Sequence, residues 1–361
     1  MASVTWEQGL AWRMRRQFID PVGDVSAVEV VRRLAGVQAQ VGSAAALAIA
    51  LRQTSPGDGD VARALLDERT LVKTWAMRGT LHLLPADEAA AYLALCGTIR
   101  SWEKPSWQKA FGASPDDLEA IAAVVGSALG DGAALTREEL AAAIMDETGS
   151  DHLAEILGSG WGMLFKPLAW WGVLCHGPSQ GNRITFVSPR AWLPGWRGLP
   201  PVEEAVRTVI RGFLGAHGPA DAAMFDNWLM RGTSRKKDVK GWFAMLEDEL
   251  ATVEVEGEPM VMLREHVDEL LATEPSRSLR LLGAFDQYVL GAGTKATYLI
   301  PAERRADVSR KAGWISPVIV HEGRVAGVWE PKDGDIAITA FGELPRDLVA
   351  AETVRLRALL P

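Results

Sequence analysis

Two glutamines separated by one alanine form the segment of this chain best suited to chemistry. Gln38 and Gln40 lie in the sequence Gly36-Val37-Gln38-Ala39-Gln40. Residues i and i+2 of an extended segment point to the same side, so the two side chains would present neighbouring amides. Such a pair offers acceptor oxygens and donor nitrogens, and it can hold and orient a water molecule. Because an amide is a weak base, this arrangement suffices only where the leaving group is already activated and the attacked carbon resembles an oxocarbenium ion. The alternative is two loop glutamines that cap helix ends.

A predicted β-hairpin carries three further candidates. The segment LVKTWAMRGTLHLL, residues 71–84, alternates around an Arg78-Gly79 turn. Thr80 and His82 would share one face of the second strand and point a polar pair toward the glutamines. We expect Arg78, Thr80 and His82 to be accessory residues. The alternative for His82 is a buried strand residue whose hydrogen bonds are satisfied.

Asp286 is the fourth accessory candidate. It follows an aromatic residue in the sequence Phe285-Asp286-Gln287-Tyr288. The alternative for this motif is a turn whose aromatic side chains pack in the core.

Basic and polar residues predict contacts with nucleic acid at two places. Positive side chains and helix N-terminal amides can together hold phosphate groups. The alternative is a solvated helix face. The candidate residues are Arg231, Arg235, Lys236, Lys237 and Lys240, and, at a second hairpin tip, Gln180, Asn182 and Arg183.

The elements that must position these residues repeat three times as helices followed by a hairpin. In the first repeat, Asp24 is predicted to cap a helix to Leu34, and an extended piece, residues 37–41, leads to a helix from Ser43 through Leu51. In the second, a Thr136/Glu139 capping box begins a helix that ends at Gly149. Helical stretches at residues 152–157 and 161–171 and a hairpin at residues 172–187 follow.

The third repeat has the most continuous helical stripe, over residues 202–213. A short helix at residues 221–230, a turn, a helix from Ser234 to Leu250 and a hairpin at residues 251–263 follow it. Helices joined by a short turn and followed by a hairpin are typical of winged helix-turn-helix units, which bind double-stranded nucleic acid or other proteins. We therefore predict an α+β, mainly α fold with winged-helix units at residues 1–115, 116–195 and 196–270 and a small β-rich region at residues 271–361.

The composition limits the class of protein. The chain has 361 residues, a formal net charge of −8 and 48% hydrophobic residues, which excludes a disordered chain and predicts no membrane span. The net charge argues mildly against a wholly basic nucleic-acid binder. The two cysteines and the absence of zinc-type spacings predict neither disulfides nor a metal site. Since the N-terminus has no signal-peptide pattern, we expect a cytoplasmic protein.

Five motifs occur in a fixed order along nearly the whole chain: VVRRLAGVQAQ (residues 30–40), MRGTLHLL (77–84), GAHGPADAAMFDNW (215–228), LLGAFDQYVLG (281–291) and GRVAGVW (323–329). Together they resemble the AlkZ/YcaQ family of bacterial winged-helix DNA glycosylases. The Gln38-Ala39-Gln40 segment matches the branch of that family whose catalytic signature ends in Gln.

The resemblance implies hydrolysis of the N-glycosidic bond of N7-alkylated purines in duplex DNA, including bulky adducts and interstrand crosslinks, and release of an abasic site. It also implies Gln38 and Gln40 as the catalytic residues, no metal or other cofactor, and a tandem winged-helix body that binds duplex DNA; we expect a monomer. Two alternatives remain. A non-catalytic winged-helix transcriptional regulator would bind undamaged duplex, and a module for small molecules or proteins would have no affinity for DNA.

Overall fold

The fold combines helices with several small sheets. The computed structural model describes residues 2–158 and 162–360, and within them helices contain more residues than strands. This confirms the predicted mixture of helix and sheet. The chain divides into two compact units. Unit 1 comprises Met1–Asp60, Ile210–Gly232 and Lys236–Pro361, and unit 2 comprises Val61–Val209 and Thr233–Arg235.

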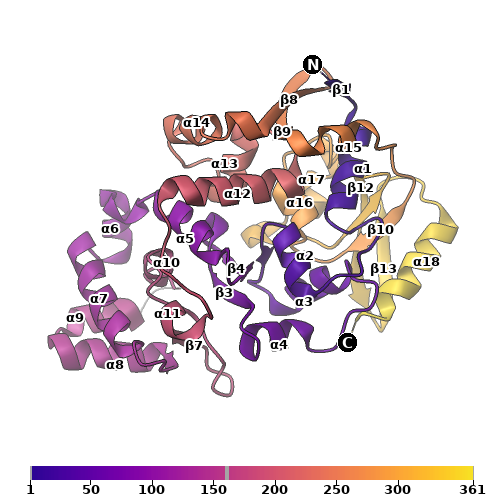
Figure 1. Cartoon of the computed structure of the whole chain (residues 1–361). Helices are drawn as coiled ribbons and strands as arrows, with labels where there is room; N and C mark the ends of the chain where they lie inside the picture. The colour runs from indigo at the N-terminus through magenta and orange to yellow at the C-terminus, as the bar shows by residue number, and fades with distance from the viewer. Residues whose placement is uncertain (1, 159–161, 361) are drawn as a thin grey trace. The chain divides into compact units, whose positions relative to one another are not determined.

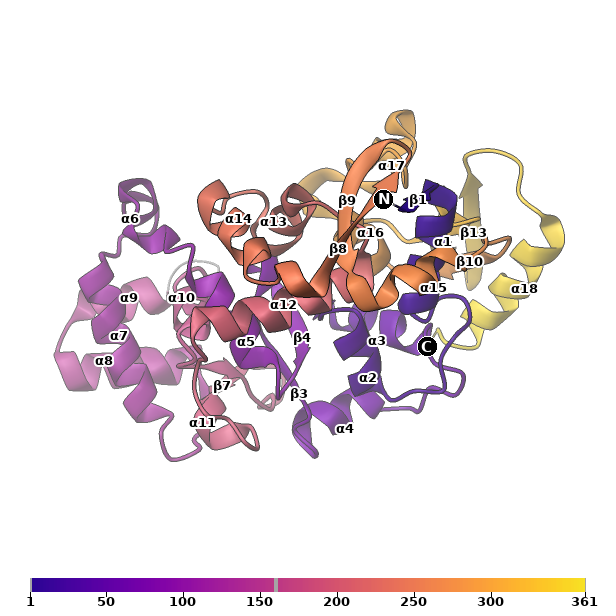
Figure 2. The ribbon, with the colours of Figure 1, turned by 45° about the horizontal axis from the view of Figure 1, so that its top comes forward.

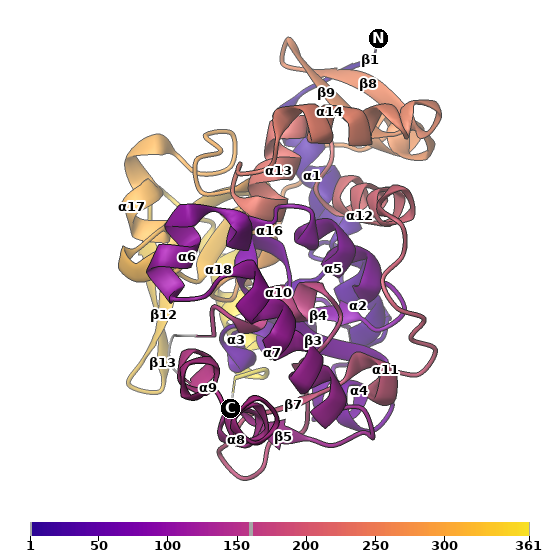
Figure 3. The same cartoon turned by 90° about the vertical axis from the view of Figure 1, so that its left-hand side faces the viewer.

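Unit 1 contains two complete sheets. Strand β1 (Ala2–Val4) runs parallel to β8 (Leu250–Val255), which pairs antiparallel with β9 (Glu258–Leu263), as Figure 3 shows. The second sheet is an antiparallel meander in the order β10-β11-β12-β13. Its strands are β10 (Leu279–Leu282), β11 (Val318–His321), β12 (Arg324–Lys332) and β13 (Asp335–Ala340).

The helices of unit 1 come from three stretches of the sequence (Figure 1). Helix α18 (Arg346–Arg357) lies alongside strand β10 (Figure 2). The short strand β2 (Val37–Gln38) lies between α2 and α3 in the sequence. The remaining helices are α1 (Trp6–Arg16), α2 (Ala27–Arg33), α3 (Gly42–Ala50), α13 (Ala222–Met230), α14 (Lys236–Ala244), α15 (Val267–Leu271), α16 (Gln287–Ala292) and α17 (Arg305–Val308). Single 3₁₀ turns are η3 (Glu247–Glu249), η4 (Arg264–His266), η5 (Ala302–Arg304) and η6 (Lys311–Gly313).

Unit 2 contains the first two predicted hairpins. Strands β3 (Leu71–Trp75) and β4 (Leu81–Pro85) pair around the 3₁₀ turn η1 (Met77–Gly79). The second hairpin belongs to a sheet of β5 (Leu135–Thr136), β7 (Thr185–Val187) and β6 (Cys175–His176). The helices of unit 2 are α5 (Ala89–Gly97), α6 (Pro105–Phe111), α7 (Pro115–Ala128), α8 (Arg137–Thr148), α9 (Asp151–Gly158), α10 (Phe165–Trp170) and α11 (Pro189–Trp192). A 3₁₀ turn, η2 (Ser101–Glu103), lies between α5 and α6. Two helices, α4 (Asp60–Leu66) and α12 (Val202–His217), cross the boundary between the units.

Several local predictions are confirmed by their hydrogen bonds. Thr136 and Glu139 form the capping box of α8, and Gly149 ends this helix in a left-handed conformation, which a residue without a Cβ adopts readily. The hairpin predicted at residues 251–263 is β8 and β9. The helical stretch predicted from residue 161 begins outside the described residues, and α10 accounts for its later part.

Two local predictions are wrong, and a third is confirmed only in part. The cap of α2 is Ser26 and not Asp24, because the Ser26 hydroxyl accepts the Glu29 amide at 3.2 Å. The helix expected to reach Leu250 ends at Ala244, since Leu250 pairs with Leu263 as the first residue of β8. The extended piece expected over residues 37–41 contains a strand of two residues, and the chain bends at Gln40 before α3.

The apolar core of unit 1 consists of several clusters. One joins Leu10 and Met14 of α1 to Tyr288 and Val289 of α16 and to the inner face of the second sheet. Another places Leu51, at the end of α3, against Leu356 of α18 and residues of β10. These clusters fix helices from opposite ends of the sequence on one sheet. None of the described helices combines the length and the apolar character needed to cross a membrane.

Candidate active site

The two candidate catalytic glutamines lie at the entrance to α3 and have different surroundings. Gln38 ends strand β2 and is 8% exposed, Ala39 is buried, and Gln40 is exposed in the bend that precedes the helix. Both glutamines have interactions with other groups. Solvent can therefore reach the Gln40 amide directly, whereas the Gln38 amide lies close to the protein interior.

Helix α3 continues from this segment and ends at a buried ion pair. Its sequence, GSAAALAIA, consists mostly of small residues, and Ala44, Ala45 and Ala48 are buried. Arg52 follows the helix; its Nη2 and Nη1 atoms lie 2.7 and 2.8 Å from the two carboxylate oxygens of Asp286. Both side chains are fully buried. A bidentate pair of this kind fixes direction as well as charge.

Asp286 therefore has a defined structural partner. Its carboxylate also accepts the Tyr288 amide at 2.9 Å, which caps α16. The structure brings Asp286 to Arg52 and not to the surface, so this carboxylate does not contact a ligand directly. Arg52 was missed in the sequence, because no local motif links residues that are 234 positions apart.

Further polar residues surround this pair inside unit 1. Gln17 Oε1 accepts Arg52 Nη2 at 3.5 Å, and the Gln17 amide nitrogen donates to the carbonyl of Ala216 at 3.0 Å and lies 3.2 Å from Nδ1 of His217. A Cβ at Gly291 would lie 2.1 Å from that same nitrogen. Only glycine fits there, because α16 passes directly against the imidazole ring.

In unit 2, the accessory candidates Arg78, Thr80 and His82 are neighbours at the hairpin turn. Arg78 has a left-handed backbone, with φ of 59°, and is half-buried. Its Nη2 lies 3.2 Å from Nε2 of His82, and the carbonyl of Thr80 lies 3.0 Å from Nδ1. The Thr80 hydroxyl donates to the Met77 carbonyl at 3.1 Å, so it belongs to the turn itself.

These contacts define the protonation of His82. A guanidinium has donors only, so Nε2 must accept from Arg78, and Nδ1 must carry the proton that it donates to Thr80. Burial, and then the charge of Arg78, lower the pKa of His82 to about 3. His82 is fully buried. It is a neutral side chain that orients Arg78, and solvent does not reach it.

The candidate DNA-binding residues are all exposed. Arg231 caps α13 in a left-handed conformation, Arg235 precedes α14, and Lys236, Lys237 and Lys240 lie on α14. At the tip of the second hairpin, Gln180 donates to the carbonyl of Ala134 at 3.1 Å and bridges to Arg183. Asn182 lies between them in sequence and is exposed.

No group of three or more His, Cys, Asp and Glu side chains suited to a metal ion occurs among the described residues. The two cysteines, Cys96 and Cys175, are buried, and burial raises the pKa of the Cys96 thiol to about 12.

Comparison with known proteins identifies the family of this chain. The family model "DNA glycosylase AlkZ-like" matches residues 31–360. An interstrand DNA cross-link repair glycosylase from Streptomyces sahachiroi is 48% identical over 343 residues, which cover 95% of this chain and 92% of that protein. The solved structure of the DNA glycosylase AlkZ from the same organism matches with a TM-score of 0.96 and 47% identity, over 99% of this chain and 97% of that one.

This agreement extends over the whole of the described fold, and it does not favour a non-catalytic transcriptional regulator. The match begins at residue 31 and includes both glutamines, the first hairpin and Asp286. The chain belongs to the AlkZ-like family of DNA glycosylases.

Proposed function

We propose that this protein hydrolyses the N-glycosidic bond of N7-alkylated purines in duplex DNA, including bulky adducts and interstrand crosslinks, and leaves an abasic site. The observation that carries the proposal is the Gln38-Ala39-Gln40 segment at the entrance to α3, in a chain of this family. The 48% identical relative, an interstrand DNA cross-link repair glycosylase, supports the substrate class.

The chemistry of the lesion suits a site with two amides. Alkylation at N7 places a positive charge on the purine, so the base leaves without protonation by an acid. Gln40, which is exposed, can hold the attacking water, and Gln38 can orient it while its oxygen faces the developing charge of the sugar. The amides thus supply orientation and electrostatic stabilisation in place of a strong base.

Duplex DNA is the partner in this proposal, and the protein acts as a monomer. The helix and hairpin repeats act as tandem winged-helix units at residues 1–115, 116–195 and 196–270, with a β-rich region at residues 271–361. Arg231, Arg235 and the three lysines of α14 contact phosphates, as do Gln180, Asn182 and Arg183 at the second hairpin tip. Backbone contacts of this kind position a protein on DNA without reading its sequence.

A glycosylase assay tests the proposal. Duplex DNA that contains one N7-methylguanine is incubated with excess protein, and alkali then breaks the strand at each abasic site. We expect breaks at the lesion with wild-type protein. We expect the double substitution Gln38→Ala and Gln40→Ala to lower the single-turnover rate by roughly 10²- to 10³-fold, as removal of oriented hydrogen-bonding groups does elsewhere.

The control is Gln108→Ala, which removes a half-buried amide from α6 and should leave the rate unchanged. A second duplex with a crosslink between two N7-alkylated guanines tests the wider substrate class. No cleavage of the methylated duplex by wild type, or an equal rate for the double variant, would refute the proposed chemistry.

A further inference from the structure

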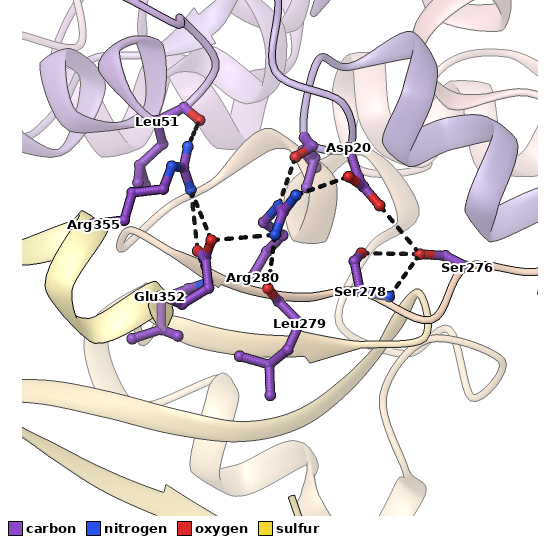
Figure 4. Close-up of polar contacts among 10 residues, drawn as sticks. Asp20, Leu51, Ser276, Ser278, Leu279, Arg280, Glu352 and Arg355 are labelled. Carbon is purple, nitrogen blue, oxygen red and sulfur yellow. Dashed lines mark hydrogen bonds and ion pairs between the residues drawn. The ribbon is translucent and has the colours of Figure 1, made fainter. Parts of the chain in front are cut away.

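The end of α3 is held by a second polar network besides the Arg52–Asp286 pair. Arg355 of α18 donates to the backbone carbonyl of Leu51 and lies 3.0 Å from a carboxylate oxygen of Glu352 (Figure 4). Glu352, at 6% exposure, also accepts the Leu281 amide at 3.3 Å and Arg280 at 3.2 Å. One buried carboxylate thus joins the last helix, strand β10 and the residue that ends α3.

The network extends to the loop that follows α1. Arg280 donates to Asp20 at 2.8 Å and to the carbonyl of Ile19 at 3.0 Å (Figure 4). Ser276 lies 3.5 Å from the other Asp20 oxygen and 2.9 Å from Ser278. One network therefore joins four segments that are distant in sequence, and it reaches residue 51 through Arg355.

Apolar packing and backbone bonds act at the same place. The Leu51 side chain is 2% exposed and belongs to the cluster with Leu356. The carbonyl of Arg52 accepts the Gly23 amide at 2.9 Å. One turn before Leu51, the Leu47 side chain of α3 would lie 3.3 Å from a Cβ at Gly283. The backbone that leads to Asp286 therefore passes close to α3. The helix is thus fixed through its side chains and through its backbone.

Helix α3 separates this anchored end from the glutamine segment, and its nine residues span about 13 Å at a rise of about 1.5 Å each. Arg52 and Glu352 are buried, so they do not contact DNA bound at Gln40. Arg355 is bonded to Glu352 and to the carbonyl of Leu51. A helix transmits a displacement of one end to the other as a rigid element. Movement of residues 51 and 52 would therefore move the bend that contains Gln40.

We infer that Arg355, Glu352 and the Arg52–Asp286 pair are positioning residues for the glycosylase reaction, because they fix the placement of Gln38 and Gln40 through α3. The inference rests on the proposed function for the role of the glutamines. The C-terminal region thereby contributes to catalysis without contact with the lesion. Placement matters in this reaction because small displacements of water-orienting groups are costly, up to roughly 10²-fold in rate for about 1 Å.

The test compares matched arginine substitutions in unit 1. Arg355→Ala removes an arginine that bonds a carboxylate and a backbone carbonyl. Arg324→Ala does the same elsewhere, since Arg324 bonds Glu7 at 2.7 Å and the carbonyl of Tyr298 at 2.9 Å. The first measurement is amide hydrogen exchange of peptides that cover residues 37–50. The second is the single-turnover rate on the N7-methylguanine duplex, together with the dissociation constant for that duplex.

For Arg355→Ala we expect faster exchange at residues 37–50, a rate about tenfold lower and a dissociation constant within about twofold of wild type. Arg355→Lys should recover part of the rate, because it restores the pair with Glu352. Arg324→Ala should change neither the exchange of this peptide nor the rate. A general loss of stability would affect both alanine variants.

The inference is overturned if Arg355→Ala leaves exchange at residues 37–50 at the wild-type level, or if exchange rises while an active enzyme keeps its rate. It is also overturned if the loss appears only in the dissociation constant. A wild-type protein that fails to cleave the lesion counts against the proposed function alone, because the exchange measurement does not depend on activity.

Discussion

Two arginines with different partners distinguish the interior of unit 1 from the first hairpin of unit 2. Arg52 is fully buried against the carboxylate of Asp286, so its charge is neutralised within the fold. Arg78 is half-buried against His82, whose imidazole is neutral and accepts one of its hydrogen bonds. The carboxylate both directs and cancels a positive charge, whereas the imidazole directs a guanidinium without cancelling its charge. The two arginines thus differ in the charge of the side chain that directs them.

The largest effect expected from this comparison follows the loss of Asp286. Asp286→Ala leaves Arg52 as a buried charge that has lost its carboxylate, which should lower the free energy of unfolding by about 3–5 kcal/mol. Urea unfolding at pH 7 measures the change. The double variant Arg52→Met with Asp286→Leu should lose less stability than Asp286→Ala alone, because it removes both charges of the pair. A change below about 1 kcal/mol for the single variant would contradict the role of this pair.

A smaller effect is expected in how the free energy of unfolding depends on pH, through His82. Its pKa is about 3 in the folded protein and 6.5 when unperturbed, so the unfolded chain takes up the proton first as the pH falls. The stability that His82 provides is therefore complete above about pH 6.5 and is lost as the pH falls toward 3. The slope attributable to His82 is about 1.4 kcal/mol per pH unit within that window.

Urea unfolding between pH 7 and pH 4 measures this slope. His176 must be considered as well, because burial, and then the charge of Lys73, lower its pKa to about 3 also. His82→Gln should lower the slope of unfolding free energy against pH by the contribution of one titrating group. The contribution of His176 should remain. If the pH dependence of His82→Gln equals that of wild type, His82 is not held neutral by the fold.

The smallest effect on stability is expected from exposed lysines, which differ from the buried Arg52 and the half-buried Arg78. Lys236 and Lys237 are exposed on α14, and phosphate contacts there would release counterions from DNA. Lys236→Gln with Lys237→Gln should reduce the slope of log affinity against log salt by about 0.9 for each contact and leave stability nearly unchanged. Fluorescence anisotropy with duplex DNA over a salt series checks this. An unchanged slope indicates a solvated helix face.

Features encoded by neighbouring residues could be predicted from the sequence. The alternating residues 71–84 give the first hairpin, and Thr136 with Glu139 gives a capping box, because both depend on contacts within a few positions. The cap of α2 was placed wrongly, since Asp24 and Ser26 are both suitable residues two positions apart and only the folded backbone selects one.

The candidate site was predictable as a set of residues, although its surroundings were not. Composition and spacing identify Gln38 and Gln40 as a pair, but their burial depends on the packing of distant segments, and one is buried while the other is exposed. The partners of Asp286 and Leu51 lie 234 and 304 positions away, and no periodicity encodes such pairings. The role of His82 likewise required the positions of both ring nitrogens.

The bond between Arg355 and Leu51 also has a consequence for biosynthesis. It closes a loop of 304 positions, so the end of α3 cannot reach its final arrangement before the ribosome has added residue 355. Contacts between distant parts of a chain form late and slow folding. The glutamine segment is therefore translated long before the arginine that supports the far end of its helix. A polypeptide interrupted before α18 would carry the intact glutamine segment and lack the bond from Arg355 to the end of its helix.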